Sequence, residues 1–325
     1  MKVLIVGYGS MGKRRIRLLQ QLEGAAEILC VDKNPSRLEQ AGAQGLRAYE
    51  DLAQALEEKP DLAFVCTSPG NHAGLILKLV DAGIHVFTEL NLVDDDYDRI
   101  MALAEERNTA VFMSSTMLYD KRIETIDRMV KAQKKPLTYL YHVGQYLPDW
   151  HPWESYQDFF IGKKETNGVR EILAIQLPWL LHTFGKIEEL SVMSHRCTQL
   201  EIDFDDSVSV TFRHESGAVG VFVADTVSRK AAVHLEIIGE DMHLLWDGHN
   251  DDLCVYDVET ATMCPVETYD AAEHVDGYAD FIIENRYADE IADFLAMVYQ
   301  NKTPRYSLLD DQYTLTIIDE IEGRR

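Results

Sequence analysis

The sequence is poor in positive charge, because 31 lysine and arginine residues stand against 55 aspartate and glutamate residues in a chain of 325. The formal net charge of −24 repels phosphate backbones and anionic membranes, so neither nucleic acid nor a membrane is an expected partner. Solubility alone is also a sufficient reason for such a charge. We therefore expect the partner to be a small molecule.

Cysteine is scarce and unpatterned, which excludes a disulfide framework and favours a reducing compartment. No set of histidine, cysteine and carboxylate residues has metal-ligand spacing, so no metal site is expected. No stretch approaches the roughly 18 apolar residues of a membrane span. The first apolar run, residues 2–6, is shorter than the about 7–15 residues of a signal-peptide core. These absences predict a cytoplasmic protein. The five cysteines are Cys30, Cys66, Cys197, Cys254 and Cys264.

Short apolar runs alternate with amphipathic segments over residues 1–118. Runs of this kind are typical of parallel strands that are buried on both faces. The alternation predicts a doubly wound parallel sheet, and hence an N-terminal Rossmann domain over residues 1–118. The expected strands are 2–6, 27–32, 62–66, 84–89 and 110–115, and the expected helices include 50–58, 73–82 and 95–107.

The pattern changes in residues 119–325, which we expect to form a second domain. A helical pattern over 119–133 precedes the strand-like "LTYLYHV" of 137–143, and apolar residues recur with period two from 207 onward. "HESGA" (214–218) reads as a hairpin turn, so this α/β domain should contain an open, largely antiparallel sheet. We expect it to bind substrate, and its open sheet face to join subunits into a homo-oligomer.

The segment "GYGSMG" follows the first expected strand and precedes the first helix. In this context a G-x-G-x-x-G turn brings the backbone close to a pyrophosphate at a helix N-terminus. Asp32 ends the second strand, where a carboxylate accepts hydrogen bonds from a ribose and repels a 2′-phosphate. NAD is therefore the expected cofactor, although the neighbouring Lys33 keeps NADP open. The candidate contacts are Gly7, Tyr8, Gly9, Ser10, Met11, Gly12 and Asp32.

A further cofactor-binding element is "TSPGNH" (67–72), directly after the expected strand 62–66. Carboxyl ends of parallel strands line the crevice in which a dinucleotide lies. Thr67, Ser68 and Pro69 are therefore candidates to face the nicotinamide half. His72 is a fourth candidate, with a helix-capping or solvated histidine as its alternative.

With these motifs the chain resembles the Gfo/Idh/MocA family, named for glucose–fructose oxidoreductase, inositol dehydrogenase and a rhizopine-catabolism protein. The resemblance extends over nearly the whole chain. It implies a Rossmann domain, a C-terminal α/β domain and hydride exchange between NAD(P) and a sugar, inositol or related polyol. It rests on "VGYGSMGKRR", "TSPGNHAGLILKLVDAGIHVFTEL", "TNGVREI…FG" and "EIADFLAMVYQNKTPRYSLLDD".

The chain departs from two signatures of the family that it resembles. The family's Glu-Lys-Pro motif corresponds to Glu89, Leu90 and Asn91, and the resemblance places Glu89 and Asn91 beside the cofactor. A lysine there holds substrate hydroxyls and assists proton transfer, which leucine cannot do. The second signature, an Asp, a His four residues later and an Asp three beyond, falls on Glu171, Ile175 and Pro178.

Replacements for the lost histidine can be sought nearby. His182 lies seven residues beyond Ile175, and a one-residue shift would put Gln176 near the histidine position. Of these residues, Glu171 and His182 are retained as catalytic candidates.

The segment 142–168 is the other place to look for the missing chemistry. Its aromatic rings suit sugar faces, and its Asp, His and Lys residues can bind hydroxyls or relay a proton. His151 and Lys164 are the preferred acid–base or substrate-holding candidates, followed by Tyr146 and Asp149. The alternative is an aromatic loop that packs over a sheet edge or contacts another subunit. The polar and aromatic residues of the segment are His142, Tyr146, Asp149, Trp150, His151, Trp153, Tyr156, Lys163 and Lys164.

The leading hypothesis is an NAD(P)-dependent dehydrogenase or reductase acting on the CH–OH group of a sugar, nucleotide-linked sugar or polyol. A second hypothesis is an epimerase, lyase or glycosidase that uses NAD as a recycled internal oxidant. A third is a catalytically silent, dinucleotide-dependent sensor or partner protein, which the two lost signatures favour.

Overall fold

The computed structural model describes two compact units of the chain. Unit 1 comprises residues 1–115 and 287–313, and unit 2 comprises residues 116–286 and 314–325. Within the described part of the chain, no helix is both long and apolar enough to cross a membrane. The described residues are 1–22, 27–150, 155–249, 252–269, 272–273 and 283–324.

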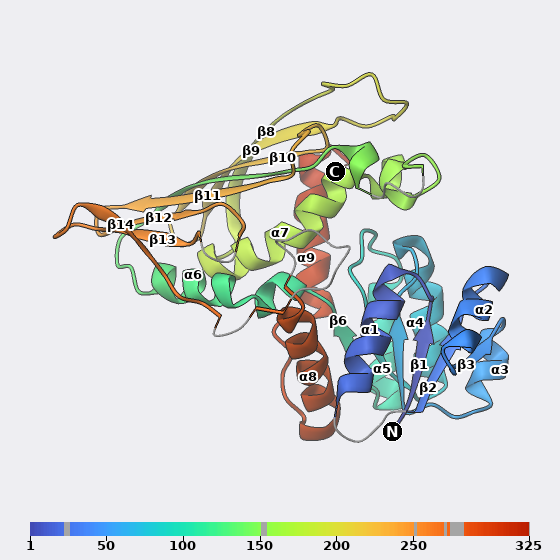
Figure 1. Cartoon of the computed structure of the whole chain (residues 1–325). Helices are drawn as coiled ribbons and strands as arrows, with labels where there is room; N and C mark the ends of the chain where they lie inside the picture. Colours follow the sequence, from blue (N-terminus) through green and yellow to red (C-terminus); the bar gives the residue numbers. More distant parts are fainter. Residues whose placement is uncertain (23–26, 151–154, 250–251, 270–271, 274–282, 325) are drawn as a thin grey trace. The chain divides into compact units, whose positions relative to one another are not determined.

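Unit 1 contains a six-stranded parallel sheet with the order β3-β2-β1-β4-β5-β6 (Figure 1). This is the order of the doubly wound dinucleotide-binding fold, and its switch point lies between β1 and β4. The predicted parallel Rossmann sheet is therefore confirmed. The strands are β1 (Lys2–Val6), β2 (Glu27–Val31), β3 (Arg47–Tyr49), β4 (Leu62–Val65), β5 (His85–Thr88) and β6 (Val111–Met113). The helices of the N-terminal segment are α1 (Ser10–Gln21), α2 (Pro35–Ala43), α3 (Leu52–Leu56), α4 (His72–Asp81) and α5 (Tyr97–Arg107), with the 3-10 turn η1 (Pro69–Asn71).

A C-terminal segment completes unit 1. It contains most of α8 (Asn285–Gln300) and the start of α9 (Leu308–Ile321). Phe294 of α8 places its ring 5.5–5.7 Å from the rings of three sheet phenylalanines, Phe64, Phe87 and Phe112. Residues 287–313, which the sequence pattern grouped with 119–325, thus belong to the core of unit 1 because an aromatic side chain anchors them there.

Unit 2 contains an eight-stranded sheet with the order β14-β13-β12-β11-β7-β10-β9-β8. All neighbouring strands are antiparallel except β7 and β10, so the predicted largely antiparallel sheet is confirmed. The strands are β7 (Thr138–Gly144), β8 (Ile187–His195), β9 (Ser207–His214), β10 (Val219–Asp225), β11 (Ala232–Gly239), β12 (Met242–Trp246), β13 (Cys254–Asp257) and β14 (Thr262–Pro265). The helical elements are η2 (Thr116–Tyr119), α6 (Lys121–Lys131), η3 (Leu147–Asp149), η4 (Phe160–Gly162), η5 (Lys164–Thr166), α7 (Gly168–Phe184) and the second half of α9.

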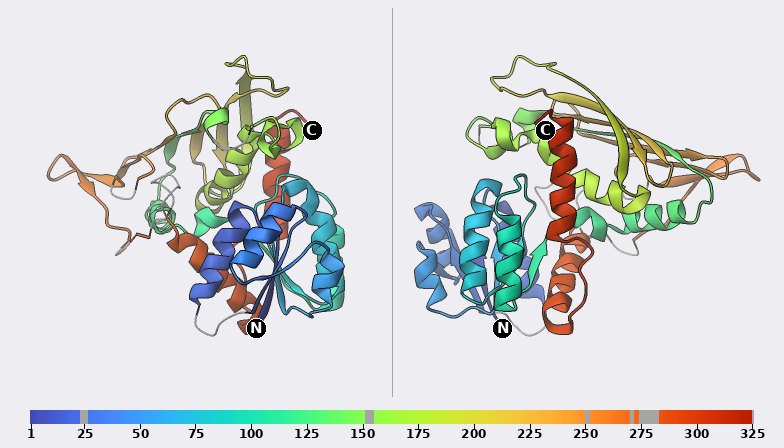
Figure 2. Two further views of the ribbon diagram at one scale, coloured as in Figure 1. Left: turned by 45° about the vertical axis from the view of Figure 1, so that its right-hand side comes forward. Right: turned by 180° about the vertical axis from the view of Figure 1, so that it is seen from behind.

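The two faces of this sheet differ. Helices α6 and α7 lie on one face (Figure 2). On that face Tyr139 stacks on Phe184, and the rings of Tyr141 and Trp179 pack in a T-shaped arrangement. No described helix lies on the other face, which we call the open face. Alternation along the strands brings four exposed large hydrophobic side chains to it: Leu140, Met193, Ile238 and Tyr256.

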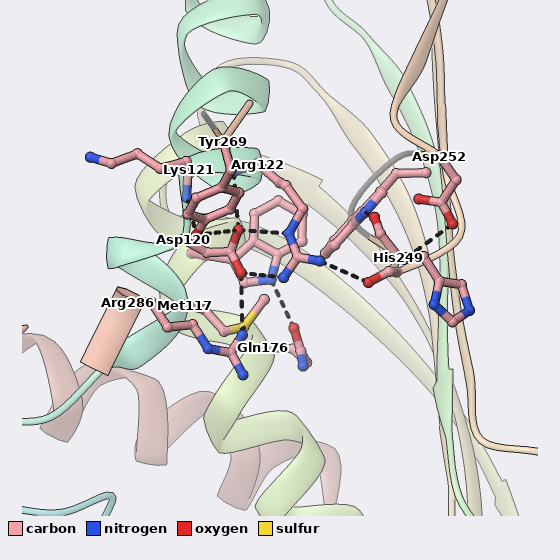
Figure 3. Close-up of polar contacts among 12 residues, drawn as sticks. Met117, Asp120, Lys121, Arg122, Gln176, His249, Asp252, Tyr269 and Arg286 are labelled. Carbon is pink, nitrogen blue, oxygen red and sulfur yellow. Dashed lines mark hydrogen bonds and ion pairs between the residues drawn. The ribbon is translucent and has the colours of Figure 1, made fainter. Parts of the chain in front are cut away.

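A buried charge cluster fixes the entrance to α6 (Figure 3). Asp120 is fully buried and accepts hydrogen bonds from Nε and Nη2 of Arg122 at 2.8 and 2.5 Å and from Nη1 of Arg286 at 3.2 Å. Arg122 also donates to the carbonyl oxygen of Gly248. Burial opposes ionisation of Asp120, but the two arginines outweigh it and lower the pKa of this carboxyl. The cluster therefore joins the start of α6 to the segment that follows β12.

Candidate functional site

The glycine turn between β1 and α1 has the geometry of a pyrophosphate-binding loop. Gly7 has a φ of +104°, and a Cβ there would lie 2.6 Å from the carbonyl oxygen of Cys66. A Cβ on Gly12 would lie 1.9 Å from the oxygen of Gly7, so helix and strand pack too closely for a side chain. At Gly9 the nearest atom is Nη1 of Arg37, 4.0 Å away, so space is left beside the backbone. This combination fits a dinucleotide phosphate at the start of α1.

The other residues of this turn have different settings. Tyr8 is buried, and its hydroxyl donates to Gln44. Ser10 is exposed and Met11 is half-buried. Tyr8 therefore contributes its backbone to this turn, while its ring packs inside unit 1.

Asp32 follows β2 and lies next to the glycine turn. Its two carboxylate oxygens accept hydrogen bonds from the backbone N–H groups of Tyr8 at 2.7 Å and Asn34 at 2.8 Å. Nη1 of Arg37 lies 3.6 Å from the same carboxylate and also borders Gly9. Sequence reasoning missed Arg37, although an arginine five residues after the strand-end aspartate was a usable signal.

The end of β4 is held by a buried histidine. Thr67 is half-buried, Ser68 is exposed and Pro69 is buried. Nε2 of His72 lies 2.8 Å from the carbonyl oxygen of Thr67, and Nδ1 lies 3.3 Å from the hydroxyl of Thr88. Burial lowers the pKa of His72, so a neutral ring donates to Thr67 and accepts from Thr88. His72 thus positions the ends of β4 and β5, which is neither the helix cap nor the solvated histidine of the sequence-based alternative.

Glu89 is paired with a buried arginine. Nε and Nη2 of Arg15 lie 2.6 and 3.1 Å from the two Glu89 oxygens, and Nη2 also donates to Glu290 at 2.6 Å. Glu290 accepts from the Ser114 hydroxyl and the Ser115 N–H. Burial raises the pKa of Glu290 despite the arginine. Arg15 and Glu290 were missed, because no local pattern brings position 290 to position 15.

Leu90 and Asn91 occupy the remaining positions of the altered motif. Leu90 is half-buried, whereas Asn91 is buried. The Asn91 amide donates to the carbonyl oxygen of Val93 and to the hydroxyl of Tyr97, both at 2.8 Å, and Tyr97 donates to Asp311. Both amide hydrogens of Asn91 are therefore used to shape the turn after β5, and its contact with a cofactor stays a prediction.

In unit 2 the candidates of segment 142–168 have different surroundings. The Tyr146 ring lies 3.9 Å from the guanidinium carbon of Arg229. The Asp149 carboxylate and the Lys164 ammonium are exposed and make no hydrogen bond or ion pair with any described residue. His151 and Trp153 lie outside the described residues. Lys164 and Asp149 are thus available to a ligand.

The aromatic part of this segment is largely a packing cluster. The buried centre consists of Leu147, Ile161 and Ile202. The Tyr156 hydroxyl also accepts a hydrogen bond from the backbone of Glu201. The structure therefore gives most of these rings the packing role that the sequence left as an alternative. The partly buried side chains around that centre are Trp150, Tyr156, Phe159, Phe160, Leu200 and Phe204.

Glu171 lies in the first turn of α7, on a rigidly held helix end. The Asn167 side chain caps this helix by accepting from Arg170 N–H, and Arg170 pairs with Asp319 and Glu322 of the C-terminal helical segment. Glu171 itself is half-buried and makes no side-chain hydrogen bond or ion pair with any described residue. Burial raises the pKa of its carboxyl to about 7. A carboxyl with a raised pKa and no partner among the described residues is a candidate acid–base group.

The two other residues considered on α7 lie elsewhere. His182 is eleven residues beyond Glu171, about 16 Å along a helix, and contacts Lys131 and Asp127 of α6. Gln176 faces the sheet, where its side-chain oxygen accepts from Tyr141 and Trp179. The structure therefore does not bring His182 to Glu171, and it places Gln176 in the core. Among the described residues no histidine, cysteine, aspartate and glutamate side chains form a group that could hold a metal.

Comparison with known proteins shows to which family the chain with this glycine turn and these two sheets belongs. A family model described as an oxidoreductase family with an NAD-binding Rossmann fold matches residues 1–115, and the Gfo/Idh/MocA C-terminal domain model matches residues 138–244. The chain belongs to the Gfo/Idh/MocA family. Family, fold and oxidoreductase class, with nicotinamide dinucleotide as cofactor, are thereby confirmed, whereas the roles of individual residues stay predictions.

Individual relatives of this Gfo/Idh/MocA protein are distant. It is 21% identical over 137 residues to the 4-carboxy-2-hydroxymuconate-6-semialdehyde dehydrogenase of Sphingobium sp. (strain NBRC 103272 / SYK-6). The matched segment covers 41% of this chain and 44% of that protein. The match thus spans less than half of the relative. Two solved structures are similar in fold over almost the whole chain.

The first solved structure is an oxidoreductase from Agrobacterium radiobacter in complex with NAD+, L-tartaric acid and magnesium. It has a TM-score of 0.84 and 14% identity, and the match covers 99% of this chain and 96% of that one. The second is the UDP-N-acetylglucosamine 3-dehydrogenase of Acidithiobacillus ferrooxidans, with a TM-score of 0.76, 16% identity and coverage of 99% and 97%. At these identities the likeness is one of fold.

Proposed function

We propose that this protein is a dehydrogenase or reductase that exchanges hydride with the CH–OH carbon of a sugar, a nucleotide-linked sugar or a polyol. The observation that carries the proposal is Glu171, a desolvated carboxyl without a protein partner in a family member that has leucine at the usual lysine position. The similarity to a nucleotide-sugar dehydrogenase and to an enzyme crystallised with a hydroxy acid supports a polyhydroxylated substrate.

The cofactor part of the proposal rests on unit 1. In our proposal the pyrophosphate binds at the turn that Gly7, Gly9 and Gly12 shape, and the adenosine ribose binds beside Asp32 and Arg37. A bound nicotinamide dinucleotide supplies the hydride acceptor or donor. Asp32 favours NAD because a carboxylate repels a 2′-phosphate.

The proton part of the proposal rests on unit 2. Oxidation of an alcohol removes a proton from the hydroxyl oxygen as well as hydride from carbon. In our proposal Glu171 accepts that proton, and returns it in the reverse direction. A general base works best when its pKa lies near the working pH, and burial brings Glu171 to about 7. Lys164 and Asp149, which are free of protein partners among the described residues, would hold substrate hydroxyls.

A second candidate function is that of a dinucleotide-dependent sensor without turnover. It is supported by the sequence-based prediction that Leu90 and Ile175 stand at the positions of the family's lysine and histidine. In that case the protein would bind NAD(H) but would turn over no sugar.

A substrate screen separates the two functions. The protein is incubated with NAD or NADP and a panel of sugars, nucleotide sugars, inositols and hydroxy acids, while absorbance at 340 nm and dinucleotide binding are followed. Turnover that Glu171→Gln abolishes and Glu165→Gln leaves unchanged would support the dehydrogenase. Glu165 is a suitable control because it is exposed and lies six residues away. Tight NAD binding with no turnover across the panel would favour the sensor.

We further propose that the open face of the unit 2 sheet joins two copies of the chain in the cytoplasm. Its exposed Leu140, Ile238 and Tyr256 side chains support an apolar contact. All five cysteines are free, which is in line with a reducing compartment. A molar mass from sedimentation equilibrium tests the self-association.

A further inference from the structure

Three histidine–carboxylate pairs lie on neighbouring strands of unit 2. The nitrogen–oxygen distances are 2.7, 2.5 and 2.8 Å, and the histidine side chains are 37%, 50% and 40% exposed. The pairs use three of the eleven histidines of the chain. In the order of these values, they are His142–Asp225, His234–Asp247 and His243–Glu236.

Strand register puts all three pairs on the open face. Tyr141 of β7 faces α7, so His142 points to the opposite side. His234 of β11 is directly across from His142. His243 of β12 is across from the exposed Ile238, and Glu236 is across from the exposed Leu140. The pairs therefore alternate with the exposed apolar side chains of this face.

Charge compensation supports a second copy of the chain as the occupant of this face. Each copy carries a net charge of −24, so the repulsion between two copies is smallest where their carboxylates have histidine or arginine partners. On the open face Asp225, Asp247 and Glu236 each have a histidine, and Glu189 has Arg213 at 3.1 Å. A face that is apolar and charge-compensated suits an identical face related by a two-fold axis.

Compensation by histidine depends on pH, whereas compensation by arginine does not. Histidine changes its charge between about pH 5 and 8. A pair of a carboxylate and a neutral histidine carries one net negative charge, whereas the same pair with one more proton is neutral overall. Taking the charged pair out of water costs more free energy than burying the neutral pair. Association should therefore be accompanied by proton uptake.

We propose that self-association through the open face is linked to protonation of these three pairs, so that the assembly tightens as the pH falls from 8 to 6. The proposal rests on the self-association proposed above. The sign follows from linkage: the associated state binds more protons, so the affinity gained is fully present at low pH and is lost as the pH rises.

The charged groups around each histidine determine how readily the three histidines can be protonated together. His142 faces Asp225 of β10 and His234 of β11, so protonation of both histidines brings two like charges opposite each other. His234 also faces Asp247, and His243 faces Glu236 of β11 and the ring of Tyr256 of β13 at 6.3 Å. Each histidine thus has its own carboxylate, which offsets the repulsion between the first two.

The test is the dissociation constant of the assembly at pH 6, 7 and 8 at fixed ionic strength, measured by fluorescence-detected sedimentation from micromolar to nanomolar concentration. If the assembly does not dissociate even at nanomolar concentration, the rate of subunit exchange is measured in place of the dissociation constant. The wild type should bind itself at least about tenfold more tightly at pH 6 than at pH 8, which needs an average net uptake of only about half a proton per association event. The variant His142→Gln/His234→Gln/His243→Gln retains hydrogen-bonding groups without the proton and should lose this pH dependence.

His182→Gln is the matched control, because His182 is an exposed histidine of α7, away from the open face. It should retain the wild-type pH dependence. A wild-type assembly of constant affinity from pH 6 to 8, or a triple variant with unchanged pH dependence, overturns the linkage while leaving the self-association standing. A protein that is monomeric at all three pH values overturns the self-association, and the linkage with it.

Discussion

Arg15 and Glu89 form a two-point ion pair in which Nε lies 2.6 Å and Nη2 lies 3.1 Å from the two carboxylate oxygens. The pair joins α1, the helix that follows the glycine turn, to the residue directly after β5. Arg15 is fully buried and also lies over the ring of Phe87. Glu89 therefore has a structural role as the partner of Arg15.

Replacement of Arg15 by methionine should destabilise unit 1 strongly. The substitution leaves Glu89 and Glu290 buried without their cation, which costs on the order of 3–5 kcal/mol. Urea-induced unfolding followed by circular dichroism measures the loss. Arg99→Met, which removes an exposed arginine 4.0 Å from Asp96, should leave the unfolding midpoint unchanged. An Arg15 variant as stable as the Arg99 variant would contradict the buried role.

Alanine at Gly9 and at Gly12 should have opposite consequences. A methyl group at Gly9 finds its nearest protein atom 4.0 Å away, so the fold should be retained while the methyl occupies the space for the dinucleotide. We expect an unchanged melting temperature and an NADH dissociation constant raised by about tenfold or more, measured by NADH fluorescence. At Gly12 the methyl would lie 1.9 Å from the oxygen of Gly7, so that variant should melt earlier. Equal NADH affinity in Gly9→Ala would refute the assignment of the turn.

The pH dependence of turnover should report on Glu171. Its carboxylate form is the base for alcohol oxidation, so kcat/KM in that direction should rise with pH and level off above about pH 7. Glu171→Gln should reduce kcat by about 10²–10⁴-fold, and Glu171→Asp should retain part of the activity. Steady-state rates from pH 5 to 9 give the profile. A wild-type profile that is flat between pH 5 and 9 would exclude Glu171 as the base.

The same carboxyl should make stability depend on pH. Burial raises its pKa from 4.5 to about 7, so the folded state favours the protonated form. The wild type should therefore lose stability relative to Glu171→Gln as the pH rises from about 4.5 to 7, and the two should be equally stable below that window. At pH 8 the variant should be more stable by roughly 1–3 kcal/mol. Denaturation at pH 4.5 and pH 8 makes the comparison; a variant less stable than the wild type at pH 8 would show that the carboxylate is well solvated.

Much of the fold could be predicted because the signals are local. Apolar runs gave β1, β2, β4, β5 and β6 within two residues of their observed ends, and period-two alternation gave β9, β10 and β11. Strands β3, β13 and β14 have three or four residues each, too few for a periodic pattern. The membership of residues 287–313 in unit 1 depends on Phe294 meeting three distant rings, which no local pattern encodes.

The candidate site divides in the same way. The glycine turn and Asp32 have fixed spacing, and they lie side by side in the structure. Glu290 is 275 residues from Arg15, so the buried triad could only be found in three dimensions. The aromatic residues of 142–168 attracted a sugar-binding interpretation because composition does not distinguish a stacking platform from a small core. Only burial showed which of them are available.

The turn after β5 also bears on which substitutions each of its positions can accept. Leu90 is half-buried, so a lysine at that position is sterically open by a single substitution. Proline at Asn91 would remove the donor to Val93 and Tyr97, and with it the contact that places Tyr97 next to Asp311. Substitutions at the two neighbouring positions are therefore unequal: position 90 can accept a lysine by itself, whereas a proline at position 91 calls for a compensating change at Tyr97 or Asp311.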